Sequence, residues 1–518
     1  MTFSLLDTPL SERPSPPAPR DGAWNRALDD AILPAPGSDT ARSRLALPGA
    51  LVVTTGQQTG LFTGPAYTVS KALSARALAL ALEQRWGRPV VPVFWVPGDD
   101  HDYDEVAAAS WLGSDGELVR AALAPRAPDA PLTPMSRQRL GPEVLQALDA
   151  FETSFVDTGT SGPAVDWLRR HYRPAATVAG AFGAAMAELL APFGILCLDS
   201  THPVVKAAAA PWILRALASA PAIERDLSEL AARLVRAGRD PGVPVGDGAT
   251  LGFLDTPLGR DRLVASGSRF QTRRGKESLS EAQLARIAKE EPGRLSGNVL
   301  LRPALESALL PTVAYVAGPG ELRYLALAEP VYRQLDIVRQ LPVPRWSGLL
   351  LEPRVTRVLT KFSASLEELT ADGGALERRL ARLALPEGTE AALGTLRSRI
   401  EQGYGPVVER IAQVDPTLTR PAAAARARAL LEVERLEKKL LQHARRRESV
   451  ELAQVARARL SVRPDGKPQE RVLSMAGFLA RYGDGVLEAY AEHIRGWYGA
   501  ALEAAPGGPR RPPSLPGS

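Results

Sequence analysis

An apolar strand, a glycine-rich turn, a helix and a second apolar strand follow one another within residues 51–96, and this order limits the possible folds strongly. Leu51-Val-Val-Thr-Thr55 is short and β-branched, as expected of a buried strand. The turn Gly56-Gln-Gln-Thr-Gly-Leu-Phe-Thr-Gly64 follows, and the next helix is expected to begin at Pro65 and end at Gly87. Val90-Val-Pro-Val-Phe-Trp-Val96 completes a βαβ unit, which predicts an α/β protein with a parallel sheet.

Two further core strands are expected, one around Gly194-Ile-Leu-Cys-Leu-Asp199 and one at Thr312-Val-Ala-Tyr-Val316. We therefore assign residues 46–360 to a Rossmann-like core, preceded by a leader and first helix at 1–45. Residues 113–190 and 207–295 are predicted to be inserted connecting segments of mainly helical character. A hairpin is expected within the second insertion, near residues 250–264.

After Arg357, long polar helices predict a coiled-coil arm over residues 361–460. A Pro/Asp/Thr-rich break at 415–421 separates two helical stretches, 364–412 and 422–458, which we expect to pair antiparallel. The predicted seam follows 4-3-4-3 spacing and consists of Ala429, Val433, Leu436, Leu440 and His443. Because this stripe is too narrow for an independent core, we expect the arm to form a homodimer. A helical segment at 461–505 is expected to pack on the core, and the tail at 506–518 to be disordered.

Composition excludes several classes of protein. With 45% hydrophobic and 23% charged residues, the 518-residue chain is globular, and no apolar run approaches the roughly 20 residues of a membrane span. No signal-peptide pattern occurs at the start, so we expect a cytoplasmic protein. The net charge of +5 comes without a compact basic tract, which argues against nucleic acid as a partner. Lysines are few, which draws attention to Lys71, Lys206 and Lys361.

The single cysteine, Cys197, excludes an intramolecular disulfide and a cysteine-based zinc site. It lies in a predicted buried strand, where a free cysteine is usually an inert core residue. If cysteine matters to this protein, it is expected as a substrate rather than as a side chain.

Three glycine-bearing or polar loops follow three predicted strands: 56–64, 98–102 and 318–321. The carboxyl ends of parallel strands share one edge of a sheet, so we expect these loops to surround one pocket. Glycines let backbone N–H groups approach a phosphate, and the helix from Pro65 would point its positive end there. The spacing is neither the dinucleotide fingerprint nor a P-loop, and a purely structural strand–helix turn remains the alternative. The residues predicted to bind a nucleotide cofactor are Gly56, Gln57, Gln58, Gly60, Thr63, Gly64, Gly318 and Gly320.

The loop Gly98-Asp-Asp-His-Asp102 concentrates acid around one histidine. We predict His101 as a general base, with Asp100 and Asp102 as its catalytic carboxylates. A Mg²⁺ ion bridging nucleotide phosphates to Asp99 or Asp100 is a further possibility. The alternative is a solvated acidic loop that leads into a helix N-terminus, where acids are favoured in any case.

Four residues are predicted to contact substrate: Asp99, Asn298, Arg302 and Glu321. Arg302 suits bidentate binding of a carboxylate, although it could equally brace a loop through an ion pair. His202 and the pair Asp199-Ser200 are weaker candidates, and His443 is expected to pack rather than to bind a ligand.

Several long motifs closely resemble those of the bacillithiol-synthesis cysteine-adding enzyme family. They are Thr55-Gly-Gln-Gln-Thr-Gly-Leu-Phe-Thr-Gly-Pro65, Pro92-Val-Phe-Trp-Val-Pro-Gly-Asp-Asp-His-Asp102, Asn298-Val-Leu-Leu-Arg-Pro303, Leu310-Pro-Thr-Val-Ala-Tyr-Val-Ala-Gly-Pro-Gly-Glu321 and Gln469-Glu-Arg471. They occur in family order over residues 51–471. Three departures are visible: Asp99 replaces a usual Glu, Ala317 a usual Gly, and Tyr324-Leu325 a usual Tyr-Trp pair.

The resemblance implies a Rossmann fold of the nucleotidylyltransferase and class I synthetase type, with a dimerising coiled-coil arm. It also implies a ligase that joins cysteine to glucosaminyl malate to give bacillithiol, with ATP as activating cosubstrate. The alternative is another nucleotidyl-transfer or aminoacyl-activating enzyme on the same fold, although a His-x-Gly-His loop and a lysine-rich signature loop are absent. A structural coiled-coil protein, the third class considered, leaves the loops at 56–102 unexplained.

Overall fold

A computed structural model describes residues 3–8, 14–246 and 248–503. The chain divides into two compact units. The core unit comprises Leu5–Leu349 and Lys467–Ser518, and the arm unit comprises Met1–Ser4 and Leu350–Gly466. The predicted disordered tail at 506–518 lies outside the described residues.

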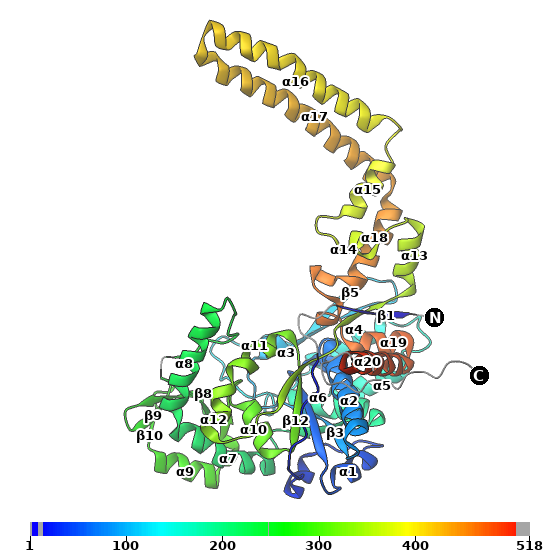
Figure 1. Cartoon of the computed structure of the whole chain (residues 1–518). Coiled ribbons are helices and arrows are strands. Elements are labelled where there is room, and N and C mark those ends of the chain that lie inside the picture. Colours follow the sequence, from blue (N-terminus) through cyan, green and yellow to red (C-terminus); the bar gives the residue numbers. More distant parts are fainter. Residues whose placement is uncertain (1–2, 9–13, 247, 504–518) are drawn as a thin grey trace, which may run out of the picture. The chain divides into compact units, whose positions relative to one another are not determined.

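A five-stranded parallel sheet forms the centre of the core unit (Figure 1). Its order is β13 (Leu341–Pro344), β12 (Thr312–Ala317), β2 (Leu51–Gly56), β3 (Val90–Val96) and β6 (Leu196–Asp199). All four neighbouring pairs run parallel. Numbered along the chain, the spatial order is 5-4-1-2-3, so the strand order reverses between β2 and β12. The predicted Rossmann-like parallel core is confirmed, and this reversal is the place where ligands bind in open α/β sheets.

The central strands are apolar on both faces because helices cover both. On one face, Val52, Val91, Val93 and Trp95 pack against η1 (Arg26–Ala31), α1 (Asp39–Leu45) and α7 (Pro203–Ala218). On the other face, α2 (Tyr67–Trp86) packs on β2 and β3, and Phe94 contacts Phe182 of α6 (Val178–Leu190). A strand buried on both faces reads as a continuous apolar run, which explains why these strands were visible in the sequence.

Helix α2 begins two residues after the predicted Pro65 and ends, as predicted, at Gly87. Gly87 has φ of 63°, the left-handed conformation that closes a helix, and its N–H donates to the Glu83 carbonyl. The preceding turn contains the short 3₁₀ helix η2 (Leu61–Thr63) and Gly64, which has φ of 68°. The Ala66 N–H donates to the Leu473 carbonyl at 2.7 Å, so part of the entry to α2 is satisfied by the C-terminal segment.

The first insertion contains β-structure that sequence analysis missed. After α3 (Tyr103–Val106), strands β4 (Ala108–Leu112) and β5 (Leu118–Ala122) form an antiparallel hairpin. Helices α4 (Glu143–Thr153), α5 (Gly162–His171), α6 and η3 (Ala191–Phe193) follow. The mainly helical character predicted for 113–190 is found from α4 onward, but β5 was missed. Its sequence, Leu-Val-Arg-Ala-Ala, is alanine-containing and short, and cross-strand pairing with β4 overrides its weak propensity.

The second insertion departs further from the helical expectation. Helices α7 and α8 (Ala220–Arg236) are followed by an antiparallel sheet of order β10-β9-β8-β7-β11. Along the chain, α9 (Glu281–Glu290) and η4 (Pro292–Arg294) lie between β10 and β11. Its strands are β7 (Ala249–Thr256), β8 (Gly259–Ser266), β9 (Arg269–Thr272), β10 (Ser278–Leu279) and β11 (Leu295–Gly297). The hairpin expected near 250–264 is confirmed as β7 and β8. The remaining strands were missed because each has only two to four residues without a clear apolar pattern, and their pairing is decided by tertiary contacts.

Helix α10 (Arg302–Leu309) leads into β12, and α11 (Pro319–Leu327) and α12 (Glu329–Leu335) lie between β12 and β13. The chain returns to the core unit after the arm as η7 (Gln469–Arg471), α19 (Met475–Tyr482) and α20 (Gly485–Glu503), and α20 packs on α2. The leader includes β1 (Ser4–Asp7) and is held by contacts to the core unit. The Asp7 carboxylate accepts a hydrogen bond from the Trp346 indole at 2.8 Å, and the Arg20 guanidinium donates to the Thr312 carbonyl at 3.1 Å.

In the arm unit, α16 (Thr389–Val414) and α17 (Thr419–Arg447) run side by side, joined by η5 (Pro416–Leu418) within the predicted break (Figure 1). The unit also contains α13 (Pro353–Lys361), α14 (Leu366–Thr370), α15 (Ala375–Leu383), α18 (Ser449–Val462) and η6 (Pro464–Gly466). The helical coiled-coil arm is confirmed, but its long pair is shorter than predicted because 364–383 and 449–462 form separate helices.

The predicted seam is correct in part. Val433 is buried and Ala429 and Leu440 are half-buried, whereas Leu436 and His443 are exposed. Ala444 is buried in place of His443. The predicted seam assumed a heptad repeat of 3.5 residues per turn. An α-helix that is not supercoiled has 3.6 residues per turn, so positions spaced as a heptad rotate away from the interface after a few turns.

None of the described helices is long and apolar enough to cross a membrane.

A buried ion pair connects the returning C-terminal segment to the sheet. Arg345, which follows β13, donates to both carboxylate oxygens of Glu470 at 2.8 and 2.6 Å, and less than a tenth of either side chain is exposed. Glu470 also accepts from the Ser347 hydroxyl at 2.5 Å. Such a pair is costly to break from one side, since the remaining charge stays buried.

We therefore predict that Glu470→Ala lowers the free energy of unfolding by about 3–5 kcal/mol, because Arg345 is left buried and unpaired. The double variant Arg345→Met/Glu470→Leu is expected to lose less than Glu470→Ala alone. Urea unfolding followed by circular dichroism measures both. If the single and double variants lose the same free energy of unfolding, the buried unpaired charge of Arg345 is not the main cause of the loss.

Candidate functional site

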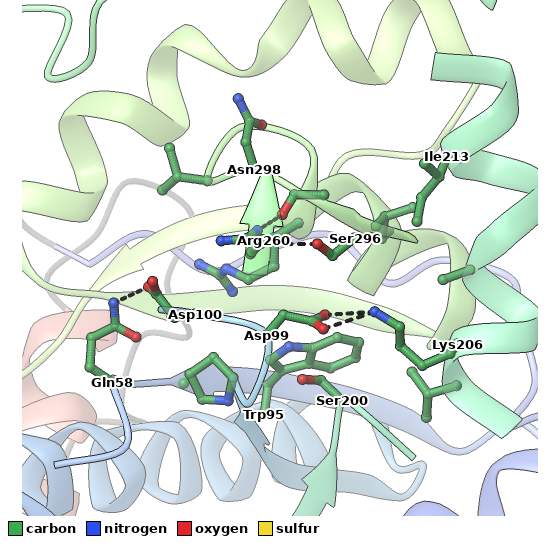
Figure 2. Close-up of a pocket in the computed structure, with 18 of the residues that line it drawn as sticks. Gln58, Trp95, Asp99, Asp100, Ser200, Lys206, Ile213, Arg260, Ser296 and Asn298 are labelled. Carbon is green, nitrogen blue, oxygen red and sulfur yellow. Dashed lines mark hydrogen bonds and ion pairs between the residues drawn. The ribbon is translucent and has the colours of Figure 1, made fainter. Parts of the chain in front are cut away.

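A cavity of about 310 Å³ opens at the carboxyl edge of the parallel sheet, at the reversal between β2 and β12 (Figure 2). One part of its wall is apolar and comes from β3, α7 and α10: Trp95, Val205, Ala209, Ile213, Leu305 and Leu309. The polar part combines the loops after β2, β3, β6 and β12 with the second insertion: Gln57, Gln58, Asp99, Asp100, Glu105, Ser200, Lys206, Arg260, Ser296, Asn298, Arg302, Glu321 and Tyr324. We call this the main cavity.

A buried ion pair holds the two strands on either side of the reversal. Lys71 of α2 is fully buried and pairs with the Glu321 carboxylate of α11. Its ammonium also donates to the Gly56 carbonyl at 2.5 Å and to Gln57 Oε1 at 3.3 Å. Burial lowers the pKa of Lys71 to about 8, and the negative charge of Glu321 opposes this fall. Burial would raise the pKa of Glu321, but Lys71 outweighs it and holds that pKa below its usual value, so the pair is ionised at neutral pH.

A second layer of charges lies around this pair. Arg302 donates to the Tyr315 and Tyr324 hydroxyls at 3.4 and 3.2 Å and pairs with Glu306 at 3.3 Å. Tyr315 in turn donates to Glu321 Oε1 at 2.8 Å. Arg302 therefore lines the main cavity and is braced by an ion pair, while its binding of a substrate carboxylate stays a prediction.

The acidic loop after β3 is folded around its own carboxylates. Asp100 Oδ1 accepts the backbone N–H groups of His101 and Asp102 at 2.6 and 3.2 Å, while Oδ2 accepts from Gln58. Burial would raise the pKa of Asp100, but the Gln58 hydrogen bond and the charge of Arg260 outweigh it and hold the pKa low. Asp102 caps α3 by accepting from the Glu105 N–H at 3.3 Å.

Gly98 permits the close approach of this loop to its neighbours. A Cβ atom there would lie 2.9 Å from Thr201 Cγ2 and 3.1 Å from Ser136 Cβ. The Ser136 N–H donates to the Gly98 carbonyl at 2.9 Å, which ties the loop to the first insertion.

His101 lies beside the main cavity rather than in its wall. Its Nδ1 is 3.5 Å from Arg260 Nη1 and 3.9 Å from Asp100 Oδ1, and its ring is in contact with Phe253. Burial, followed by the charge of Arg260, lowers the pKa of His101, so the imidazole is neutral at pH 7. The ring can accept a proton there, but Arg260 is the side chain that reaches the cavity.

Glu105 is the carboxylate of this loop region whose charge is least compensated. Burial raises its pKa, and the charges of Asp102 and Asp100 raise it further. Glu105 lines the main cavity together with Gln58 and Asp100. A carboxylate with a raised pKa is a stronger base than an ordinary one, as general base catalysis requires.

Arg260 enters the site from the second insertion (Figure 2). Its guanidinium donates to the Ser296 hydroxyl at 3.0 Å and the Gly297 carbonyl at 2.6 Å, and lies 4.0 Å from the centre of the Phe253 ring. The neighbouring Gly259 has φ of +84°, and a Cβ atom there would lie 2.4 Å from the Leu132 backbone. Glycine therefore allows the Leu132 carbonyl to accept the Arg260 N–H at 2.9 Å.

Lys206 in the first turn of α7 binds both oxygens of Asp99, at 2.8 and 3.0 Å (Figure 2). The lysine side chain is only 5% exposed, and Asp99 supplies the partner that a buried ammonium group needs. Ser200 lies nearby in the cavity wall and donates to the Val96 carbonyl at 2.7 Å.

The structure brings together about half of the residues predicted from sequence. Those that line the main cavity are Gly56, Gln57, Gln58, Asp99, Asp100, Asn298, Arg302 and Glu321. Those that are not part of its lining are Gly60, Thr63, Gly64, His101, Asp102, Gly318 and Gly320. Gly64 and His101, which we expected around the same pocket, are not among its lining residues.

The second half of the glycine turn faces protein instead of the cavity. The Thr63 N–H donates to the Tyr172 hydroxyl at 2.8 Å, and the Phe62 carbonyl accepts from Ser474 at 2.8 Å. Gly318 N donates to Glu321 Oε2 at 2.8 Å and caps α11. These backbone groups are used within the fold, since a buried N–H without a partner is costly.

Sequence reasoning missed Arg260, Ser296 and Tyr324, and gave Glu105 and Lys206 no role. Lys206 could have been predicted as a site residue from the sequence, because it lies shortly after the end of a predicted strand. Arg260 could not, since nothing local distinguishes it from the many other arginines of the chain. Among the weaker candidates, His202 precedes α7, Lys361 pairs with Glu451 at 3.6 Å, and His443 is exposed.

Cys197 is buried in β6, as predicted, and burial raises the pKa of its thiol far above the usual value. A thiol held neutral in this way is a poor nucleophile.

No group of three metal-binding side chains occurs among the described residues. The two aspartates considered for Mg²⁺ are already engaged, Asp99 by Lys206 and Asp100 by Gln58 and two backbone N–H groups. The loop does not fit a directly held metal ion.

Glu306 generates a pH-dependent prediction, because its Oε1 atom is buried without a hydrogen-bond partner in the described structure. Burial raises the pKa of Glu306 to about 7, against roughly 4.3 in an unfolded chain. The folded state therefore holds the proton more tightly, and stability from Glu306 is full below about pH 4.3 and is lost as the pH rises to about 7.

Glu306→Gln stays neutral at every pH. We expect the variant to gain stability relative to wild type between pH 5 and pH 8, by on the order of 2 kcal/mol. Urea midpoints of both proteins at the two pH values give this difference. A difference that does not change with pH would show that Glu306 is ionised throughout.

Comparison with known proteins gives two family matches that together cover most of the chain. Residues 38–346 match the family described as "Bacillithiol biosynthesis BshC, N-terminal Rossmann-like domain", and residues 348–496 match "Bacillithiol biosynthesis BshC, C-terminal coiled-coil domain". A protein of Koribacter versatilis is 34% identical over 84% of this chain and 80% of its own length. One of Symbiobacterium thermophilum is 32% identical over 92% of this chain and 88% of its own. Both carry the name "Putative cysteine ligase BshC".

Proposed function

The chain belongs to the bacillithiol biosynthesis BshC family, and on that basis we propose that it is a ligase that joins the carboxyl group of cysteine to the amine of glucosaminyl malate. The product of this amide-forming step is bacillithiol. The observation that carries the proposal is the main cavity, in which buried cations and carboxylates face one another at the reversal of the sheet.

The charges of the main cavity match those of glucosaminyl malate, which has two carboxylates and one amine. Arg260 and Arg302 supply buried guanidinium groups, which suit carboxylate binding, and Asn298 lies beside them. Asp100 and Glu105 lie on the side of Gln58 and suit an ammonium group. We propose that the malate group binds at the arginines and the sugar amine at the two acids.

The amine must lose a proton before it can attack an activated carboxyl group. We propose Glu105 as the base, because it lines the main cavity and its pKa is raised by burial and by two neighbouring carboxylates. Asp100 pairs with the ammonium group and orients it. His101 positions Arg260, and Asp102 positions the Glu105 segment through the α3 cap.

Formation of an amide from a free carboxylate is uphill in water, so the proposal includes activation of cysteine by ATP. Gly56, Gln57 and Gln58 are the part of the glycine turn that faces the main cavity, and Lys206 supplies a buried positive charge beside it. Mg²⁺ would enter as the counterion of the nucleotide phosphates.

The second candidate function is another aminoacyl-activating or nucleotidyl-transfer enzyme on the same fold. The strand order favours the general class, because nucleotide-binding α/β sheets share this reversal. Product analysis with and without glucosaminyl malate separates the two functions: amino-acid-dependent ATP consumption that needs no sugar acceptor would favour the second.

We expect the purified protein to form bacillithiol only when cysteine, glucosaminyl malate, ATP and Mg²⁺ are all present. Glu105→Gln is expected to lower kcat by about 10²- to 10⁴-fold, the usual contribution of a general base. The activity that remains in this variant should also depend less on pH. In wild type, activity is expected to rise with pH as Glu105 deprotonates, at a pH above that of an ordinary carboxyl group because its pKa is raised. Mass spectrometry of the thiol product over pH 5–9 measures both effects.

His101→Ala is the matched comparison. If His101 only positions Arg260, this variant should raise KM for glucosaminyl malate while the shape of the pH profile is retained. A full loss of kcat in folded His101→Ala with little effect of Glu105→Gln would assign the base to His101 instead. Absence of product from wild type with every substrate supplied would refute the ligase proposal.

We also propose that the arm forms a homodimer. Apolar side chains of α16, η5 and α17 that the intramolecular pair does not cover are Leu396, Val407, Val414, Leu418, Leu431 and Leu436. Burial of such side chains between two copies would supply the missing apolar contacts.

Sedimentation at micromolar concentration is expected to show a dimer. Leu431→Glu/Leu436→Glu should shift it toward monomer by at least tenfold in the dissociation constant, since charges replace buried apolar groups. Lys438→Glu adds the same side chain at an exposed polar position and should leave the dimer intact. A monomeric wild type would contradict this prediction.

A further inference from the structure

A second cavity of about 370 Å³ adjoins the main cavity in the core unit. Its wall comes from the loop after β3, the first insertion, the start of α7, the end of β7 and η4: Asp99, Pro134, Ser136, Arg137, Thr201, Lys206, Asp255, Glu291, Gly293 and Arg294. Asp99 and Lys206 line both cavities, so their ion pair lies at the junction.

The lining of the second cavity is balanced in charge. Three cations, Arg137, Lys206 and Arg294, share the wall with the carboxylates of Asp99, Asp255 and Glu291. A cavity of this kind offers little to a dianion or to a nucleotide, because each cation has a carboxylate close by. It suits a small ligand that carries one charge of each sign.

Two groups in the wall retain bonding capacity. The Lys206 ammonium uses two contacts on Asp99 and has three donors in all. Asp255 pairs through Oδ2 with Arg137, and its backbone carbonyl accepts from Arg294 at 3.1 Å. The other carboxylate oxygen, Oδ1, is buried and accepts no hydrogen bond in the described part of the chain. A buried carboxylate oxygen without a donor is unfavourable, and a ligand ammonium group supplies that donor.

We propose that the second cavity binds a free α-amino acid as its zwitterion, with the ammonium group at Asp255 and the carboxylate at Lys206 and Arg294. Given the ligase function proposed above, on which this assignment rests, the amino acid is cysteine. Its carboxylate then lies at the Asp99–Lys206 junction, next to the main cavity that we assign to the amine-bearing substrate. We assign the thiol to the uncharged part of the lining, which includes Pro134, Thr201 and Gly293.

This arrangement gives the Asp99–Lys206 pair a positioning role. Lys206 compensates the carboxylate charge at the point where the two substrates meet, and Asp99 keeps the buried ammonium in place. Asp99 is thus the partner of a buried lysine rather than a free substrate ligand.

Calorimetric titration of the full-length protein with L-cysteine under reducing conditions tests the proposal. Cysteamine lacks the carboxylate and 3-mercaptopropionate lacks the amine, and each is expected to bind at least tenfold more weakly than cysteine. Asp255→Asn and Arg294→Met should each weaken cysteine binding about tenfold or more. In steady-state assays both should raise KM for cysteine, while KM for glucosaminyl malate stays within twofold.

Arg286→Met is the matched control, because Arg286 forms an exposed ion pair with Glu290 on α9, outside the cavity. Circular dichroism and unchanged KM for glucosaminyl malate show that a variant is folded. Wild-type cysteine affinity in both cavity variants, or competition between glucosaminyl malate and cysteine for one site, would overturn the proposal. Zwitterion-dependent binding without any product would support the second cavity and refute the ligase function, so the two failures are distinguishable.

Discussion

The buried ion pair between Lys71 and Glu321 is the interaction on which the site depends. It connects α2, which follows β2, to α11, which follows β12, across the point where the strand order reverses. The same ammonium holds the Gly56 carbonyl, and the same carboxylate caps α11 and accepts from Tyr315. Because a buried charge is stable only with its partner, these contacts fix the separation of the two loops. Arg302, Tyr324 and the wall of the main cavity are built on that frame.

Carboxylates around the main cavity are distinguished by their partners rather than by their type. Asp100 accepts hydrogen bonds from Gln58 and two backbone N–H groups, Asp99 pairs with Lys206, and Glu321 pairs with Lys71. Glu105 lies among them with less compensation, and its pKa is raised while that of Asp100 is lowered. Two acids only a few residues apart are thereby suited to different tasks, one to hold a cation and the other to accept a proton.

The second insertion contributes charged side chains to both cavities. Arg260, Arg294 and Asp255 come from its antiparallel sheet and from η4, and Gly259 lets that sheet approach the first insertion closely. The chemistry of the two cavities is therefore shared between the strand-end loops, which supply mainly acids, and the inserted elements, which supply mainly arginines. This division is consistent with a single fold that binds different substrates through different insertions.

The sequence alone determined the parallel core, because strands buried on both faces have continuous apolar sequences. It also determined where α2 ends, because Gly87 adopts the left-handed conformation that closes a helix. It also determined that Gly56, Gln57, Gln58, Asp99, Asp100 and Glu321 meet, because residues at the carboxyl ends of parallel strands share one edge. Only the tertiary structure decided that Thr63 bonds to Tyr172 and Phe62 to Ser474, and that His101 lies beside Arg260. A side chain's direction at a strand end depends on partners distant in sequence, and the pairing of short polar strands such as β9 and β11 depends on neighbours rather than on local propensity. Arg260 and Asp255 therefore became visible as site residues only when the second insertion was seen folded against the sheet.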